Sequence, residues 1–594
     1  MHQPRPEHPR PQFFREEWIN LNGDWDFNFD FGLSGEEKGW HQDSSALNQK
    51  ITVPFCPEST ASGIGYTDFM PAVWYQRTFE VPDAWTGKRV LLHFGAVDYE
   101  CKTWINGKAV GSHIGGSASF VFDITDAVQS GTNVVVVNAK DDTRSGLQPG
   151  GKQAPELYSN GCMYTRTTGI WQTVWLEAVS DYSLESVSVV PDLDGSRFVV
   201  TPVLRQSQRG LYFKASLLEA GRVVADVTSP ATTGAAISIH VPDPHPWSCD
   251  DPHLYDLRFE LLLNDDIVDS VQSYAGLRKF HIEGHRFFLN NVPIFLRLVL
   301  DQGFYRDGIW TAPDDDALRS DIEISQAVGF NGARLHQKVF EERFHYWADR
   351  LGYLTWGEFS DWGLDFSRPE ALHNHQREWR EVMLRDRNHP SIVVWTPFNE
   401  SIRGAQQAPG PHRQSHLEIY EMTRALDPTR PVHDTSGYVH VRTDIYSVHD
   451  YDQDTESFHE RYQSLDPQNP EKAFIRYPDI SEPYSGQPYV VDEYGGSWWV
   501  EGSDAEGSDY EEGWGYGNRP RTIEEVYERI EKLTATLLSH PNISGYTYTQ
   551  LTDVEQEENG IYTYDRRLKF DAARLRKAFG GSAAIEDVRQ IYAH

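Results

Sequence analysis

The sequence predicts a multidomain protein with an N-terminal β jelly-roll sandwich, an immunoglobulin-like β-sandwich and a C-terminal TIM (β/α)8 barrel. The chain has 594 residues, enough for three or four domains of roughly 100–200 residues each. In the first half, short apolar runs alternate with turn residues, which is typical of β-sandwiches. From about residue 279, apolar runs alternate with helical stretches, which indicates βα units.

Residues 1–180 carry the signals of the first sandwich. Val90–Phe94 and Val134–Asn138 are apolar runs of strand length. Asn106 and Gly107 stand between two such runs, and both residues tolerate positive φ. We therefore expect a tight hairpin at this dipeptide within a jelly-roll domain.

Residues 181–278 continue the β pattern over a length that suits a small immunoglobulin-like sandwich. The domain lacks the Cys–Trp–Cys spacing of antibody domains. Its strand candidates are Val187–Val190, Phe198–Val203, Leu211–Leu217 and Leu257–Leu263.

Residues 279–594 contain eight strand candidates separated by helical segments, as in a TIM barrel. Helices are expected over Asp314–Val328, which offers acidic caps, and over Thr522–Ser539, where Thr522 and Glu525 have capping-box spacing. The strand candidates are Ile294–Val299, Gly332–His336, Leu354–Phe359, Ile392–Pro397, Val432–Thr435, Ile445–His449, Tyr489–Asp492 and Gly545–Thr549.

Two glutamates directly follow strand candidates on opposite sides of the barrel. Glu400 follows the fourth candidate and Glu493 the seventh. Active sites of TIM barrels lie at the carboxyl ends of the strands. Two carboxyl groups facing each other there are what glycoside hydrolysis requires, since one protonates the leaving oxygen while the other attacks or activates water.

The segment NHPSIVVWTPFNE, residues 388–400, resembles the acid/base signature of glycoside hydrolase family two. This family includes β-galactosidases, β-glucuronidases and β-mannosidases. Further similar motifs are Trp18 with Leu21-Asn22-Gly23 and Trp25, Trp74–Phe79, Phe94–Tyr99 and Gly169–Gln172. The resemblance covers essentially the whole chain. It implies the three domains named above and a reaction that needs no metal or organic cofactor.

The resemblance also assigns roles to the two glutamates. It implies that Glu400 is the acid/base and Glu493 the nucleophile of a retaining reaction. Retention implies carboxyl groups roughly 5–5.5 Å apart. We expect burial and the neighbouring Glu493 to raise the pKa of Glu400.

Other polar residues at strand ends are candidates for substrate binding. By resemblance, Asn399 would bind the hydroxyl next to the anomeric carbon, Arg334 would keep Glu493 ionised, and Tyr451 would donate a hydrogen bond to Glu493. The alternative for each is a structural role: a strand-end turn residue for Asn399, a structural ion pair for Arg334, and no contact with the nucleophile for Tyr451. Further residues that follow or end strands and are candidates for contacting sugar hydroxyls are His449, His336, Asp301 and Glu358.

Two departures from the family pattern indicate a divergent subfamily. The eighth strand lacks the tryptophan that often floors the sugar site, so Tyr548 or Gln550 is expected to line it instead. The lysine with which glucuronidases hold the substrate carboxylate is also missing, and acidic residues occupy 555–558. This composition favours a sugar that carries only hydroxyl groups.

The sequence therefore predicts a retaining exo-glycosidase that cleaves terminal β-glycosides, with β-galactosidase-like specificity. The alternatives within enzymes are a β-glucuronidase, a glycosidase for arabinosyl or galactofuranosyl units, or a transglycosidase. A non-catalytic carbohydrate-binding protein is the alternative of another class. Both carboxylates are present, which disfavours that last reading.

Composition excludes several partners. A formal net charge of −34 disfavours nucleic acid and anionic membranes, because both need basic surfaces. No apolar run reaches the roughly 18 residues of a membrane span. The four cysteines form no CxxC pair, and no signal-type segment opens the chain, so we expect a cytoplasmic protein. A homo-oligomer is expected, and the Trp-rich loop 497–521 is expected to wall the aglycone side or form an oligomer contact.

Overall fold

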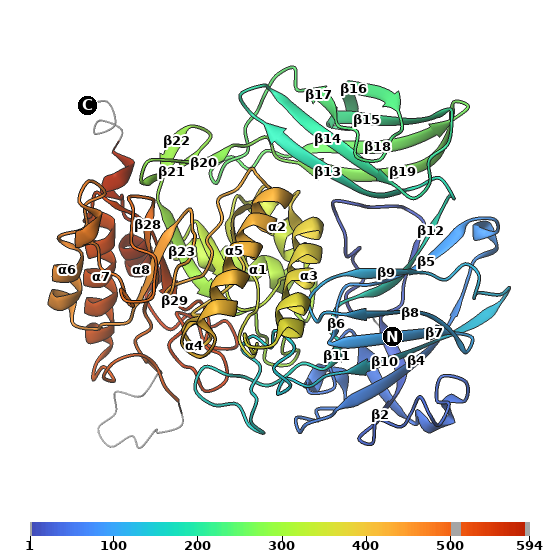
Figure 1. Ribbon diagram of the computed structural model, residues 1–594, viewed down its shortest axis with the longest axis horizontal. Helices are drawn as coiled ribbons and strands as arrows, with labels where there is room; N and C mark the ends of the chain where they lie inside the picture. Colours follow the sequence, from blue (N-terminus) through green and yellow to red (C-terminus); the bar gives the residue numbers. More distant parts are fainter. Residues whose placement is uncertain (1–2, 501–512, 588–594) are drawn as a thin grey trace.

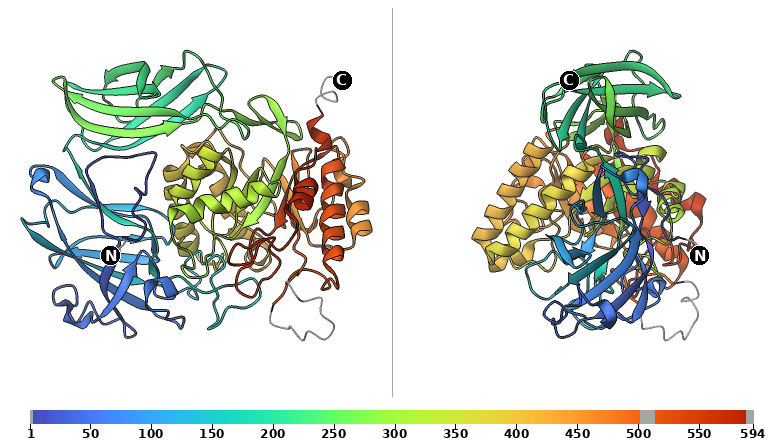
Figure 2. Two further views of the ribbon diagram at one scale, coloured as in Figure 1. Left: turned by 180° about the vertical axis from the view of Figure 1, so that it is seen from behind. Right: turned by 90° about the vertical axis from the view of Figure 1, so that its right-hand side faces the viewer.

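The computed structural model describes residues 3–500 and 513–587. Two β-sandwiches and a barrel make up the chain, in the order that the sequence predicted. Figure 1 shows the blue N-terminal sandwich and the green second sandwich beside the barrel, which runs from yellow to red. In the side view of Figure 2, the green sandwich lies above both other domains.

The N-terminal sandwich packs a four-stranded sheet against a six-stranded sheet. Apolar side chains such as Trp25, Tyr75 and Leu92 fill the space between them and are almost fully buried. The predicted hairpin is confirmed: Asn106 and Gly107 join two antiparallel strands with φ of 52° and 78°. In sheet order, the strands are β1 (Trp18–Asn20), β12 (Val174–Val179), β5 (Arg89–Phe94) and β9 (Phe120–Asp123), then β3 (Gln49–Val53), β2 (Gly23–Phe29), β4 (Ala72–Glu80), β10 (Thr132–Lys140), β7 (Glu100–Ile105) and β8 (Lys108–Ile114).

The second sandwich has sheets of three and four strands with an apolar core between them. A small three-stranded sheet then leads to the barrel. The sandwich strands in sheet order are β13 (Leu184–Asp192), β14 (Arg197–Leu204) and β17 (Ile237–His240), then β16 (Arg222–Pro230), β15 (Leu211–Glu219), β18 (Tyr255–Leu263) and β19 (Asp266–Ala275); the small sheet holds β20 (Phe280–Glu283), β21 (Arg286–Leu289) and β22 (Val292–Ile294). The boundaries that we predicted at residues 180 and 278 fall in the connections β12–β13 and β19–β20, and they stay a prediction.

The barrel sheet has seven parallel strands within the described residues. The predicted fifth strand is wrong as a regular strand. Residues 432–436 lie next to β26 and the residues that follow it, yet they pair there only through isolated bridges, Trp395 to Val432 and Asn399 to Ser436. In sheet order the strands are β26 (Ile392–Thr396), β25 (Leu354–Glu358), β24 (Gly332–Leu335), β23 (Leu296–Asp301), β29 (Ile543–Thr549), β28 (Tyr489–Gly495) and β27 (Tyr446–Asp450).

Helices cover the outside of the barrel (Figure 1). Both predicted caps are present: Asp314 accepts a hydrogen bond from Ala317 N, and Thr522 accepts one from Glu525 N. The helices are α1 (Asp315–Ala327), α2 (Glu342–Leu351), α3 (Pro369–Asp386), α4 (Ile402–Gln407), α5 (Pro409–Leu426), α6 (Thr455–Tyr462), α7 (Ile523–Ser539) and α8 (Ala572–Phe579). Within residues 3–500 and 513–587, no helix has both the length and the apolar character needed to cross a membrane.

Polar contacts hold the three domains together. Arg15 donates to Asp269 of the second sandwich and to Glu177 of the first. Asn388 of the barrel bonds the backbone of β13, and Glu378 of α3 accepts from Ser117 N of the N-terminal sandwich. All these groups are buried or half-buried, so the N-terminal domain is seated firmly on the barrel.

Candidate active site

Glu400 and Glu493 come together at the carboxyl end of the barrel strands. Glu493 lies within β28, and Glu400 lies four residues beyond the end of β26. One carboxylate oxygen of each lies within 4.8 Å of the other. The backbone of Glu400 has φ of 48° and donates from its N–H to Ser436 O at 2.9 Å. A glutamate in this left-handed region is strained, as is common where function fixes a side chain.

His449 lies between the two glutamates. Its Nδ1 is 2.6 Å from Glu400 Oε1 and 3.2 Å from Glu493 Oε2. On the other side of the ring, Nε2 is 3.3 Å from Asp492 Oδ1 and 3.0 Å from Ser436 Oγ. The imidazole therefore touches three carboxylates at once, which favours its charged form.

The charges of this cluster differ from the prediction. Burial alone would lower the pKa of His449, but Glu493, Asp492 and Glu400 outweigh burial and raise it to about 10. Burial alone would raise the pKa of Glu400, but the His449 cation outweighs burial and holds it below its usual value. The expectation of a raised pKa for Glu400 is thus wrong for the free protein, because it left the imidazolium out.

Arg334 and Tyr451 hold the other side of Glu493. Arg334, a residue of β24, is fully buried and donates a hydrogen bond of 2.7 Å to Glu493 Oε1. Tyr451 donates to Glu493 Oε2 at 2.6 Å, so the hydrogen bond expected for it is present. Tyr451 in turn stacks on Tyr516, with ring centroids 3.4 Å apart. Both carboxylate oxygens are therefore positioned by charged or hydroxyl donors.

Glu358 and His336 lie behind Arg334. Arg334 Nε is 2.9 Å from Glu358 Oε2, and His336 Nδ1 is 3.1 Å from Glu358 Oε1. Burial raises the pKa of Glu358 to about 7, although Arg334 opposes the shift. Both residues contact the arginine that holds Glu493, and their predicted contact with sugar stays a prediction.

Asn399 and Gln550 each have a buried atom without a hydrogen-bond partner in the described part of the chain. Asn399 Oδ1 accepts from Arg334 at 3.1 Å, and its Nδ2 has no partner. Gln550 Nε2 donates to Asn559, and its Oε1 has no partner. Each of these two atoms is therefore free to bond a water molecule or a ligand.

Asp301 and Tyr548 do not join the cluster. Asp301 accepts from Gly303 N, and burial together with Asp321 raises its pKa to about 6. Tyr548 packs against Phe579 of α8, with ring centroids 4.9 Å apart, so it belongs to the core outside the barrel. The contact that we expected between these residues and sugar stays a prediction.

Sequence reasoning missed Lys152, Trp362 and Tyr438. Lys152 belongs to the connection between β10 and β11 (Gly169–Ile170) in the N-terminal domain, and its Nζ lies 4.1 Å from the ring centroid of Trp362. Trp362 Nε1 donates to Asn399 O at 3.1 Å. Tyr438 hydrogen-bonds Glu400, with φ of 58°. The only feature of the sequence that could have indicated Lys152 is the pair of glycines, Gly150 and Gly151, that precedes it.

The structure describes part of the Trp-rich loop. Residues 501–512 of the predicted loop 497–521 lie outside the described residues. In the described part, Trp514 Nε1 donates to Gly161 O of the N-terminal domain, while Tyr516 stacks on Tyr451. The loop therefore contacts the catalytic end of the barrel, and its role toward an aglycone stays a prediction.

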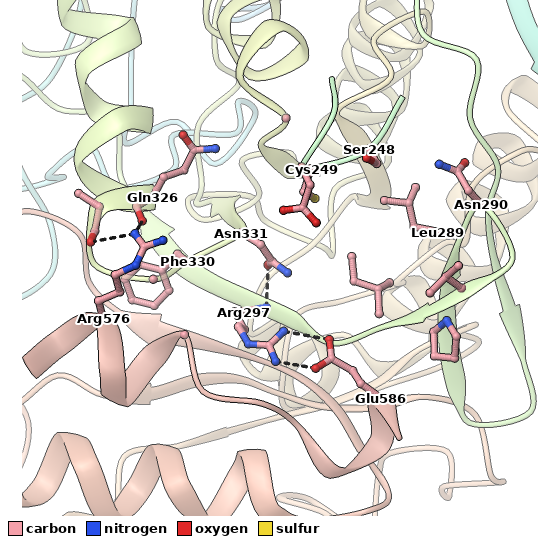
Figure 3. A pocket seen from close by; sticks show the side chains of 18 residues that line it. Ser248, Cys249, Leu289, Asn290, Arg297, Gln326, Phe330, Asn331, Arg576 and Glu586 are labelled. Carbon is pink, nitrogen blue, oxygen red and sulfur yellow. Dashed lines mark hydrogen bonds and ion pairs between the residues drawn. The ribbon is translucent and has the colours of Figure 1, made fainter. Parts of the chain in front are cut away.

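A cavity of about 860 Å³ lies at the opposite end of the barrel (Figure 3). Arg297 and Asn331, at the amino-terminal ends of β23 and β24, line it, and Arg297 pairs with Glu586 at 2.6 Å. This end of a TIM barrel serves stability, whereas catalysis uses the other end. The cavity is therefore separate from the candidate active site.

Glu400, His449 and Glu493 also have the donor atoms that a metal ion would use. Hydrogen bonds and ion pairs already join these atoms to one another and to Arg334. We therefore interpret the group as two carboxylates bridged by an imidazolium. The expected absence of a metal stays a prediction.

Family models match each of the three domains. The sugar binding domain of glycosyl hydrolases family 2 matches residues 19–148, a further family 2 domain matches 204–278, and the family 2 TIM barrel domain matches 280–503. The chain is 26% identical to a β-glucuronidase of Paenibacillus borealis over 453 residues, which cover 70% of this chain and 72% of that one. It is 27% identical to a β-galactosidase of Thermoanaerobacter pseudethanolicus over 406 residues, 65% of this chain and about half (51%) of that one.

Solved structures share the whole fold. A β-glucuronidase from Ruminococcus gnavus in complex with D-glucuronic acid superposes with a TM-score of 0.78 at 20% identity, covering 98% of this chain and 100% of that one. The β-glucuronidase of Lactobacillus rhamnosus gives 0.80 at 21% identity, with the same coverage. These likenesses establish the fold, and the domain matches establish the family. The chain therefore belongs to glycosyl hydrolase family 2, a family of O-glycosyl hydrolases.

Proposed function

We propose that this chain is a retaining exo-glycosidase that cleaves terminal β-glycosides through a covalent glycosyl-enzyme intermediate. The observation that carries the proposal is the pairing of Glu400 and Glu493, with carboxylate oxygens within 4.8 Å of each other. Retaining enzymes place their two carboxyl groups about 5–5.5 Å apart, whereas inverting enzymes leave room for a water at roughly 6.5–9.5 Å. A decayed binding protein would not need this pairing.

In the first step, Glu493 attacks the anomeric carbon. Arg334 and Tyr451 hold its carboxylate with hydrogen bonds of 2.7 and 2.6 Å, so the nucleophile is oriented before substrate binds. The bond from the anomeric carbon to the leaving oxygen breaks. That oxygen takes the single proton that Glu400 and His449 share, and the sugar becomes an ester of Glu493.

In the second step, Glu400 acts as base. It removes a proton from a water molecule, the water oxygen bonds to the anomeric carbon, and the ester bond to Glu493 breaks. A sugar hydroxyl in place of water would give transglycosylation by the same route. The free Nδ2 of Asn399 is suited to donate a hydrogen bond to a sugar hydroxyl, and this hydrogen bond would strengthen as the transition state forms.

For the sugar, we place the β-glucuronide ahead of the β-galactosidase-like specificity that the sequence favoured. Relatives from Paenibacillus borealis and Rattus norvegicus carry the name β-glucuronidase, and one from Thermoanaerobacter pseudethanolicus carries the name β-galactosidase. Both sugars therefore enter the test, together with arabinosides and the galactofuranoside.

The test is hydrolysis of nitrophenyl glycosides by the purified protein. The panel holds β-galactopyranoside, β-galactofuranoside, β-glucuronide, β-mannoside, β-glucoside and both arabinosides. We expect turnover of at least one, and its loss in Glu493→Ala, with recovery of a glycosyl azide when azide is added. Turnover in Glu493→Ala at the wild-type rate would contradict the proposal.

A parallel variant tests the acid. Glu400→Ala should slow glycosides with poor leaving groups far more than nitrophenyl glycosides, because an activated aryl leaving group needs little protonation. Equal slowing of both kinds of substrate would contradict acid catalysis by Glu400.

We propose in addition a cytoplasmic protein that forms a homo-oligomer. The four cysteines are free thiols, which suits a reducing compartment. Light scattering on the eluting protein measures the oligomer, and fractionation of the source cells measures the location. A monomer, or a secreted protein, would contradict this part.

A further inference from the structure

Tyr516 packs its ring flat against Tyr451, the tyrosine that hydrogen-bonds the nucleophile. The two ring centroids lie 3.4 Å apart, and the ring planes differ by 4°. Tyr451 donates to Glu493 Oε2 at 2.6 Å, and its hydroxyl oxygen also lies 3.0 Å from Thr549 Oγ1. Within residues 3–500 and 513–587, no other aromatic ring stacks on Tyr451. The face of this ring is therefore supported by one aromatic residue, Tyr516.

Tyr451 needs such support because no regular element holds it. It directly follows Asp450, the last residue of β27, and lies in the connection to α6. Its side chain is half-buried rather than enclosed in the core. A side chain in such a place has several staggered rotamers open to it. Contacts such as the stack on Tyr516 select the rotamer that reaches Glu493.

Tyr516 belongs to a strip in which glycines and aromatic residues alternate, Gly-Trp-Gly-Tyr-Gly at residues 513–517. Backbone hydrogen bonds fix the strip at two points. Tyr516 N donates to Gly496 O at 2.8 Å, and Glu558 N donates to Trp514 O at 2.9 Å. The strip is thus bonded on one side to the residue that follows β28 and on the other to the turn that follows β29.

Two glycines let the strip approach the barrel this closely. Gly496 has φ of 70°, and a Cβ there would lie 2.6 Å from Tyr516 Cδ2. A Cβ at Gly515 would lie 2.6 Å from the backbone Cα of Trp498. Only glycine fits at both points. The Tyr516 ring therefore lies directly against the end of β28, the strand that carries Glu493.

Trp514 ties the same strip to the N-terminal domain. Its Nε1 donates to Gly161 O at 2.6 Å, and its ring meets the Tyr516 ring edge to face, with centroids 5.3 Å apart. Burial, together with the charges of Glu557 and of the two catalytic glutamates, raises the pKa of Tyr516, so its ring stays uncharged beside them. Tyr516 is therefore held by its backbone and by Trp514 at the edge of the catalytic cluster.

We propose that Tyr516 is a positioning residue for the nucleophile, whose ring holds Tyr451 in the rotamer that donates to Glu493. This rests on the proposed function, and it assigns the strip of residues 513–517 a part in the attack on the anomeric carbon. If Tyr451 turned away, Glu493 Oε2 would keep His449, at 3.2 Å, as its close partner in the described part of the chain. Misplacing a reacting group by about 1 Å can cost about 100-fold in rate.

Crystal structures of variants test the contact directly. Tyr516→Leu removes the ring, whereas Tyr516→Phe keeps it without the hydroxyl. The proposal predicts that the Tyr451 hydroxyl stays on Glu493 in the wild type and in Tyr516→Phe and turns away in Tyr516→Leu. Gly496→Ala changes neither tyrosine, should displace the same ring and should have the same effect, so it serves where Tyr516→Leu does not fold. A contact between Tyr451 and Glu493 that persists after the ring is removed or displaced would overturn the proposal.

A double-mutant cycle tests the consequence for the rate. Tyr516→Leu should lower kcat/KM for a nitrophenyl glycoside by about 10–100-fold, and Tyr516→Phe should stay within about threefold of the wild type. In Tyr451→Phe the donor is already gone, so adding Tyr516→Leu should cost less than about twofold more. Tyr212→Leu, at a 46% exposed tyrosine of the second sandwich, is the matched control and should change nothing.

Losses that multiply in the double variant would overturn the proposal, because the two tyrosines would then act independently. So would a Tyr516→Phe variant as slow as Tyr516→Leu, because the ring would then not be the part that matters. If the wild-type chain cleaved none of the nitrophenyl glycosides, the proposed function would fail, while the crystal structures would still decide whether Tyr516 holds Tyr451.

Discussion

His449 Nδ1 lies 2.6 Å from Glu400 Oε1, and the same nitrogen lies 3.2 Å from Glu493 Oε2. The acid/base and the nucleophile thus share one imidazole as their neighbour. Asp492 and Ser436 contact the far nitrogen of the ring and Tyr438 its face, while Arg334 and His336 lie beyond Glu493. Glu400 and His449 therefore share one proton. The proton lies either on His449 or on Glu400, and a single proton transfer converts one state into the other.

His449→Asn should move the basic limb of the pH profile. In the wild type, the pair keeps its proton up to the pKa of His449, about 10, so kcat/KM should fall only in strongly basic solution. In the variant, Glu400 alone must hold the proton, and the limb should shift to lower pH. His373→Asn, at an exposed histidine, is the control. An unchanged profile in His449→Asn would show that the imidazole only supports the structure.

The same histidine should make stability depend on pH. Its folded-state pKa of about 10 lies above its ordinary value of 6.5, so the stabilisation is fully present below about pH 6.5 and disappears as the pH rises through about 10. The difference in free energy of unfolding between wild type and His449→Asn should therefore shrink across this range. Chemical denaturation at several pH values measures it. A difference that grows with pH would contradict the assigned charge.

Arg334→Met should both destabilise and inactivate the protein. The arginine is fully buried and pairs with Glu493 and Glu358, so its removal leaves two buried carboxylates without their cation. We expect a loss of about 3–5 kcal/mol in stability and of about 100-fold or more in kcat/KM. Adding Glu358→Gln should restore part of the stability, since one orphaned charge is then gone. Chemical denaturation of the single and double variants measures the change in stability, and steady-state kinetics measures kcat/KM. Additive losses of stability would contradict the coupling between Arg334 and Glu358.

Gly437→Ala should displace His449. Gly437 has φ of 64°, and a Cβ there would lie 2.5 Å from His449 Cδ2. We expect a loss of about 1–3 kcal/mol in stability, from the strained backbone, and a fall in kcat/KM. Gly410→Ala is the matched control, because a Cβ there meets nothing within 4 Å. Similar effects of the two substitutions would contradict the close contact.

The order of domains and the two glutamates were predictable from the sequence because each produces a pattern among neighbouring residues. Periods of two and 3.6 residues separate sandwiches from barrel, and Glu400 and Glu493 directly follow apolar runs. The fifth barrel strand was not predictable in the same way. Residues 432–435 have the pattern of a strand, but on the β26 side they form only isolated bridges, and toward β27 a side-chain hydrogen bond joins His433 to Ser447 at 2.7 Å.

The charge of Glu400 and the position of Lys152 beside Trp362 depend on contacts that no local pattern shows. His449 comes from a strand that begins 46 residues after Glu400, and it reverses the pKa shift that burial would cause. Lys152 comes from another domain, in a connection without regular periodicity. Long-range contacts decide both, so the sequence alone favoured a raised pKa for Glu400.

The most direct test of the central claim is to trap the glycosyl-enzyme intermediate. A 2-deoxy-2-fluoro glycoside with a good leaving group, of the sugar that the panel identifies, should inactivate the protein, because fluorine destabilises the transition state of both steps and the ester accumulates. The account predicts that mass spectrometry of the digested protein finds one fluoro-sugar on the peptide that contains Glu493, and none in Glu493→Gln. A label on Glu400 or another residue, or steady turnover with no label under these conditions, would contradict it.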